Sequence, residues 1–157
     1  MLDEIFAANR FDIVPQLAAL LSAYLLALPI GWNREQHERS AGLRTFPLVA
    51  VATCGFVQAA EPLVVNDPEA MARIIEGLIT GMGFIGGGAI LRKEDSVKGT
   101  ATAASLWVTG AIGAAVGLGS YDVAVVLSII TIVTLWAMSP LKRLGKSVKS
   151  GEPYEKK

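Results

Sequence analysis

The stretch GLITGMGFIGGG, residues 77 to 88, places six glycines in twelve positions. Gly81, Gly83 and Gly86 match the G-x-G-x-x-G pattern of a dinucleotide-binding turn. Such a turn follows a short strand, and an acidic residue about 20 positions later binds the ribose of the nucleotide. Here the stretch is apolar or small apart from Thr80, and the residue at that distance is Leu106. The glycines therefore do not indicate a nucleotide site.

Composition indicates a membrane protein. The chain has 157 residues, of which 52% are hydrophobic and 18% charged, and its mean hydropathy is +0.48. About a quarter of the residues of a soluble domain are charged, and here the charges lie in short stretches between long apolar ones. We predict an all-α polytopic membrane protein.

About 20 helical residues cross a bilayer core, and this length predicts five transmembrane helices. Residues 1–12 are expected to form a short segment at the outer surface, and residues 140–157 a basic cytoplasmic tail. The predicted spans are Ile13–Trp32, Phe46–Val65, Ile74–Leu91, Thr100–Leu118 and Val123–Ser139.

The distribution of basic residues predicts the orientation. All of the 14 Lys and Arg residues except Arg10 and Arg73 lie in the two loops and the tail that a five-span topology places on one side. By the positive-inside rule, the amino terminus is outside and the carboxyl terminus cytoplasmic. Asp3 and Glu4 stand where a cleavable signal peptide would be basic, so we expect none.

The glycines are explained by helix packing, because small residues let membrane helices approach closely. Gly77 and Gly81 form a G-x-x-x-G motif. Contact of this helix face with the same face of a second copy would form a homodimer. We predict that the third and fourth spans form the tightly packed centre of the bundle. The alternative for Gly86, Gly87 and Gly88 is a kink that lines a polar pocket. The packing candidates are Gly77, Gly81, Gly83, Gly86, Gly87, Gly88, Gly110, Gly113 and Gly117.

Hydroxyl groups follow one stripe of the fourth span at Thr102, Ser105 and Thr109, where they can bond neighbouring helices or their own carbonyls. Cys54 is the single cysteine. It excludes an intramolecular disulfide and is interpreted as a small packing residue. His37, the one histidine, is expected to be solvated.

Three segments resemble the consecutive motifs of the MgtC/SapB family of bacterial inner-membrane proteins. They are GWNREQHERSAGLRTFPLVAV (31–51), DPEAMARIIEGLITGMGFIGGGAILR (67–92) and VKGTATAASLWVTGAIGAAVGLGSY (97–121). The resemblance implies a five-helix domain linked to growth at low magnesium, acid tolerance and survival in phagocytes, with a regulatory role that includes restraint of the ATP synthase in some members. The polar motif residues are Asn33, Arg34, Glu35, Arg44, Thr45, Asp67, Arg73, Glu76, Lys98, Thr100 and Thr102.

Two departures from the family pattern stand out. The first motif usually reads G-x-E-R-E, whereas Asn33 here precedes Arg34 and Glu35. Many members carry a soluble carboxyl-terminal domain, and this chain ends after a short basic tail.

The charged residues of the first loop have two interpretations. Arg34 with Glu38, and Glu35 with Arg39, have the i, i+4 spacing of weak solvated pairs. Alternatively, Arg34, Glu35 and Arg44 hold the loop against the bundle. For Arg44 at the start of the second span, the competing role is interfacial snorkelling.

On the outer side, Asp67 before Pro68 is a good N-cap for the third helix, and this role competes with ion coordination. Glu76 lies inside the span, where ionisable residues are rare unless paired or functional. Mg²⁺ prefers oxygen ligands, so Asp67 and Glu76 are the candidate metal ligands. The competing explanation is that acids stand out on this side simply because it has few basic residues.

No catalytic arrangement or metal-ligand spacing is present, and the basic tail lacks the aromatics of a nucleic-acid site. We therefore predict a non-enzymatic regulator of magnesium-linked homeostasis in the inner membrane. It would need no cofactor, with Mg²⁺ as the possible exception. Its expected partners are the lipid bilayer and either a second copy or a membrane complex such as the ATP synthase. The alternative is a transporter or channel for Mg²⁺ or another ion.

Overall fold

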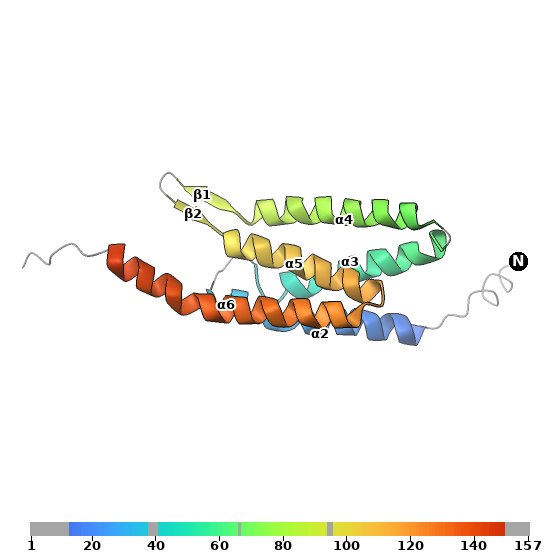
Figure 1. Ribbon diagram of the computed structural model, residues 1–157, viewed down its shortest axis with the longest axis horizontal. Coiled ribbons are helices and arrows are strands. Elements are labelled where there is room, and N and C mark those ends of the chain that lie inside the picture. The colour runs from blue at the N-terminus through green and yellow to red at the C-terminus, as the bar shows by residue number, and fades with distance from the viewer. Residues whose placement is uncertain (1–12, 38–40, 66, 94–95, 150–157) are drawn as a thin grey trace, which may run out of the picture.

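The computed structural model describes residues 13–37, 41–65, 67–93 and 96–149, with the side chains of His37, Lys93 and residues 138–149 left out. Long helices run antiparallel in succession, and a hairpin joins the third to the fourth (Figure 1). The elements are α2 (Ile13–His37), α3 (Thr45–Ala60), the short 3₁₀ helix η1 (Glu61–Leu63), α4 (Pro68–Gly88), β1 (Leu91–Lys93), β2 (Ser96–Lys98), α5 (Thr100–Gly117) and α6 (Tyr121–Lys149).

The all-α membrane prediction is confirmed. Among the described residues, three stretches are long and apolar enough to cross a bilayer: Ile13–Gln36, Thr45–Leu63 and Thr100–Gly117. The described apolar part of α6 is shorter, Tyr121–Ala137. α4 is 21 residues long, enough to cross by length, but it is not among the helices apolar enough to qualify.

Two helices extend beyond the predicted spans. α4 begins at Pro68, six residues before the predicted span, because Asp67 caps it and Pro68 suits its first turn. α6 continues to Lys149, so the first part of the predicted basic tail is helical. The predicted surface segment 1–12 lies outside the described residues.

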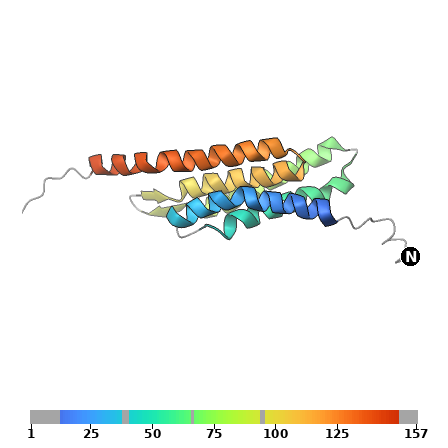
Figure 2. The same ribbon diagram turned by 90° about the horizontal axis from the view of Figure 1, so that it is seen from below.

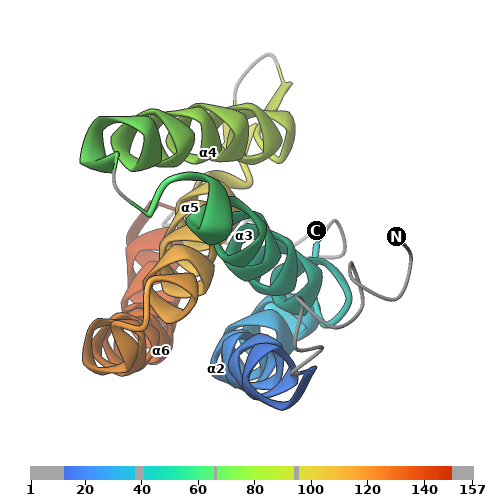
Figure 3. The same ribbon diagram turned by 90° about the vertical axis from the view of Figure 1, so that its right-hand side faces the viewer.

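α5 occupies the centre of the bundle and contacts α2, α3, α4 and α6, as the end-on view shows (Figure 3). Its glycines let α3 approach closely. A Cβ atom at Gly113 would overlap the Ala50 carbonyl oxygen, and one at Gly117 would lie 3.0 Å from the Cys54 carbonyl oxygen. The predicted packing role of Gly110, Gly113 and Gly117 is therefore confirmed, and Cys54 is buried as expected.

The prediction that the third span also belongs to the packed centre was wrong. α4 lies at the periphery, against α5 and with little contact to α3 (Figure 3). Of the glycines in α4, only Gly86 packs closely: a Cβ atom added there would lie 3.3 Å from the Ala103 carbonyl oxygen. An added Cβ would meet nothing within 4 Å at Gly77, Gly81, Gly83, Gly87 or Gly88. The helix is continuous through Gly88, so these glycines do not break it.

α6 contacts α2, and in the view from below the two helices run lengthwise along the bundle with α5 seen between them (Figure 2). The Ser128 hydroxyl on α6 donates a 2.8 Å hydrogen bond to the Leu26 carbonyl on α2. Ser128 is buried, so this bond satisfies a polar group that would otherwise be costly in the interior.

The loop predicted between the third and fourth spans forms a two-stranded antiparallel hairpin. Leu91 pairs with Lys98, Arg92 with Val97 and Lys93 with Ser96. Gly99 then turns the chain into α5 with a positive φ of 88°. The hairpin lies at the end of the bundle toward which α6 runs (Figure 1).

Candidate functional site

The polar motif residues gather at the two ends of the bundle. At the hairpin end, Arg34 and Asn33 near the end of α2 are each only 5% exposed. Arg34 Nη2 donates a 2.9 Å hydrogen bond to Asn33 Oδ1. Arg34 therefore belongs to the bundle interior and not to a solvated helix face. The carboxamide oxygen of Asn33 accepts from the guanidinium at the position where the family usually has an acid.

The chain after α2 folds back against that helix. Glu35 Oε2 accepts a 3.1 Å hydrogen bond from the Leu43 amide. Gly42 lies so close that an added Cβ would overlap the Glu35 carboxylate. The contact of Glu35 with the folded-back loop agrees with the interpretation that this residue holds it. The same role for Arg34 stays a prediction, and Glu38 and Arg39 lie outside the described residues.

We expect Asn33→Leu to lower the free energy of unfolding by about 1–3 kcal/mol, because it removes a hydrogen-bond acceptor from a buried cation. Asn33→Asp should lose less, since a carboxylate oxygen also accepts and makes a charge-assisted bond. Reversible unfolding in detergent, followed by circular dichroism, measures both. Equal stability of the two variants would contradict this role for Asn33.

The other cationic motif residues at this end are exposed. Arg44 precedes α3 as its N-cap residue, and Thr45, which is partly buried, begins the helix. The predicted part of Arg44 in holding the loop stays a prediction. Lys98 is exposed on the hairpin and Thr100 at the start of α5. This end of the bundle therefore combines a buried guanidinium with exposed cations.

The hydroxyl stripe of α5 is internal. Thr102, Ser105 and Thr109 are at most 3% exposed. Ser105 Oγ donates to the Ala101 carbonyl at 2.7 Å, and Thr109 Oγ1 donates to the Ser105 carbonyl at 2.8 Å. Because the Ser105 and Thr109 hydroxyls bond to their own helix, these two do not provide free ligands along its length.

At the opposite end, the predicted capping role of Asp67 is confirmed, since its Oδ1 accepts a 2.9 Å hydrogen bond from the Ala70 amide. Arg73 Nη2 lies 4.0 Å from Asp67 Oδ2, and Arg73 Nη1 lies 3.9 Å from Glu69 Oε2; the side chains of both ion pairs are exposed. Glu76 is exposed on α4. Within the described part of the chain, no group of three or more His, Cys, Asp or Glu side chains is placed to hold a metal ion.

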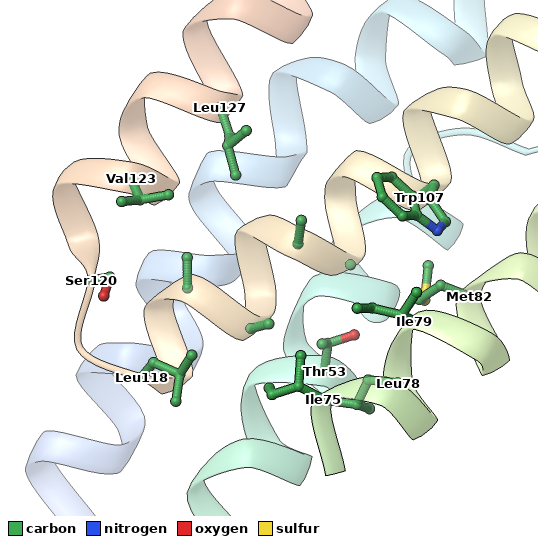
Figure 4. Close-up of a pocket in the computed structure, with 14 residues that line it drawn as sticks. Thr53, Ile75, Leu78, Ile79, Met82, Trp107, Leu118, Ser120, Val123 and Leu127 are labelled. Atoms are coloured by element: carbon green, nitrogen blue, oxygen red, sulfur yellow. The ribbon is translucent and has the colours of Figure 1, made fainter. Parts of the chain in front are cut away.

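Two apolar hollows flank α4. The first, of about 320 Å³, lies where α4, α5 and the start of α6 meet, with Trp107 and Ile79 at its wall (Figure 4). The second, of about 580 Å³, is a groove between α3 and α4. Leu78, Met82 and Thr53 line both hollows, and the Thr53 hydroxyl is bonded to the Val49 carbonyl at 2.9 Å. Apolar side chains make up most of both linings, and Arg44 and Thr45 belong to the second.

The sequence analysis missed the contact that holds α4 in place. Met82 packs over Gly110, with its Cγ 2.8 Å from an added Cβ there. Leu78, Met82 and Gly86 follow at intervals of four residues, which places them on one face of a helix. The spacing can be read from the sequence. The sequence does not show that this face, and not the face with Gly77 and Gly81, packs against α5.

Comparison with known proteins shows which family this chain resembles. The MgtC family model matches residues 20–144. Protein SrpB of Synechococcus elongatus is 35% identical over 80% of this chain and 76% of its own length. Protein MgtC of Salmonella typhimurium is 37% identical over 78% of this chain and 52% of its own, and protein MgtC of Brucella abortus 36% over 79% and 51%. No solved structure matches.

The chain thus spans about half the length of the MgtC proteins that it matches. The matched region contains the buried Asn33–Arg34 pair, the loop held by Glu35, and α3 to α5 with their close glycine contacts. On this match, which covers most of its length, the chain belongs to the MgtC family.

Proposed function

We propose that this protein is a non-enzymatic regulator of magnesium-linked homeostasis in the bacterial inner membrane, and that it acts through contacts of α4 with a protein partner. The observation that carries the proposal is the outer face of α4. Glu76, Thr80, Gly83 and Gly87 have the i, i+4, i+7, i+11 spacing of one helix face. All four are exposed, and none lines either hollow.

This face is poorly suited to lipid. Ionisable side chains in membrane helices are rare unless paired or functional, and small residues are typical of helix–helix interfaces. An added Cβ at Gly83 or Gly87 would meet nothing within 4 Å, so each position has room for the backbone of a partner helix. A second copy or a membrane complex such as the ATP synthase would supply that helix.

The alternative is transport of Mg²⁺ or another ion. Hydrated Mg²⁺ requires oxygen ligands, and the two hollows beside α4 are lined almost entirely by hydrocarbon. The Thr53 and Thr109 hydroxyls are bonded to backbone carbonyls of their own helices. These features favour the regulator over the transporter.

We expect Gly83→Leu and Gly87→Leu to abolish complementation of growth at low magnesium while the protein still accumulates in the membrane, because the larger side chains would keep a partner helix away. Ala104→Leu, at an exposed position of α5, is the matched control and should complement normally. Normal complementation by both glycine variants would overturn the proposed contact.

Mg²⁺ uptake into proteoliposomes separates the two functions. The folded wild-type protein is expected to pass no Mg²⁺. Saturable uptake that is lost in Glu76→Gln would instead establish transport and assign Glu76 to the pathway.

A further inference from the structure

The groove between α3 and α4 is an apolar hollow with a cationic end. Its volume of about 580 Å³ lies within the range of ligand pockets, about 300–1,000 Å³. Leu48 and Phe56 on its α3 side remain 63% and 62% exposed. The lining residues are Arg44, Thr45, Leu48, Val49, Ala52, Thr53, Phe56, Gly77, Leu78, Gly81, Met82 and Ile85.

The groove exists because α4 is held from the other side. Met82 sits over Gly110 and Gly86 over Ala103, whereas added Cβ atoms at Gly77 and Gly81 would meet nothing within 4 Å. The α4 wall therefore contains bare backbone with space in front of it. In a bilayer, an apolar hollow of this kind fills with hydrocarbon, since water gains few hydrogen bonds there.

Arg44 and Thr45 lie where α3 begins, so they mark one end of the groove. Arg44 is exposed, and its guanidinium makes no salt bridge with any described residue. Arg92 and Lys98 add exposed cations on the hairpin that continues from α4 at this end. Glu35, a carboxylate of the same end, already accepts the Leu43 amide; Glu38, Glu94 and Asp95 lie outside the described residues.

We propose that the α3–α4 groove binds one acyl chain of an anionic phospholipid, and that Arg44 holds its phosphate. Arg recognises phosphate through a planar fork of donors, and the Thr45 hydroxyl beside it can donate a further hydrogen bond. An anionic headgroup at the cationic end and a hydrocarbon chain along the apolar wall match the two chemistries of the groove. This inference does not depend on the partner contact proposed for the outer face of α4.

Native mass spectrometry of the full chain tests the headgroup contact. The protein is reconstituted in an equal mixture of phosphatidylglycerol and phosphatidylethanolamine, extracted in detergent, and analysed for the lipids that stay bound. The wild-type protein should retain phosphatidylglycerol preferentially. Arg44→Gln should reduce this preference about fivefold, the effect of one basic residue at an anionic surface, and Arg44→Lys should retain most of it. Arg73→Gln, which removes an exposed arginine outside the groove, is the matched control and should change nothing. An unchanged preference in Arg44→Gln would overturn the phosphate contact.

Filling the groove tests the acyl chain. Gly81→Leu places a side chain in the groove, and Gly83→Leu places the same side chain on the outer face of the same helix; both positions are open. Gly81→Leu should reduce the retention of both lipids severalfold, whereas Gly83→Leu should not. Wild-type lipid retention by a folded Gly81→Leu protein would overturn the proposal. If that variant also changed from dimer to monomer, the occupant of the groove would be a second copy.

Discussion

Replacement of Gly113 by alanine is expected to lower the free energy of unfolding by at least about 1–3 kcal/mol, the usual cost of overpacking a filled interior. The added Cβ would overlap the Ala50 carbonyl oxygen and lie 3.0 Å from the carbonyl carbon. Backbone atoms of a helix cannot rotate aside as a flexible side chain can, so α3 and α5 must move apart at this contact. Reversible unfolding in detergent, monitored by circular dichroism, measures the loss.

Gly83→Ala and Gly87→Ala are the controls for this prediction. They lie in a helix with open space around the new Cβ, and alanine is favoured over glycine in a helix interior by roughly 0.5–1 kcal/mol. These variants should therefore be as stable as the wild type or slightly more stable. Equal effects at Gly113 and Gly83 would show that α3 and α5 do not approach each other as closely as described.

Replacement of Gly99 by alanine is expected to destabilise the protein by roughly 2–5 kcal/mol, from two separate causes. A side chain at φ 88° costs about 1–2 kcal/mol of backbone strain. The new Cβ would also overlap the Ala89 carbonyl oxygen, with an overpacking cost of about 1–3 kcal/mol. Thermal unfolding in detergent gives the size of the loss.

Gly119 separates these two causes. Its φ of 76° is also positive, but an added Cβ there would meet nothing within 4 Å. Gly119→Ala should therefore show the backbone strain alone, and the difference between the two variants measures the overlap with Ala89. If Gly119→Ala were as destabilising as Gly99→Ala, the close packing of the end of α4 against the start of α5 would contribute nothing.

These glycines also decide which functional experiments can be interpreted. Leucine at Gly113 would disrupt the contact of α5 with α3, so loss of function in that variant would report misfolding. Leucine at Gly83 or Gly87 enters open space on the outer face of α4. Only the latter kind of variant tests a partner contact in a folded protein.

The amino-acid sequence by itself determined the class of protein and much of its local structure. Long apolar stretches separated by short charged ones define membrane helices, because the backbone must satisfy its hydrogen bonds internally in lipid. The N-cap at Asp67 was equally predictable, since a cap involves residues only a few positions apart. The close packing of Gly113 and Gly117 followed from their regular spacing on one span.

The tertiary structure alone decided which small and charged residues face the interior. Glycines at helical spacing are compatible either with a close neighbour or with an empty face. The glycines of α5 have close neighbours, whereas most of those of α4 face open space. Arg34 and Arg44 have the same side chain, yet one is buried and the other exposed beside a groove. The physical reason is that periodicity specifies the faces of a helix, whereas the neighbour of each face depends on how the helices pack around α5.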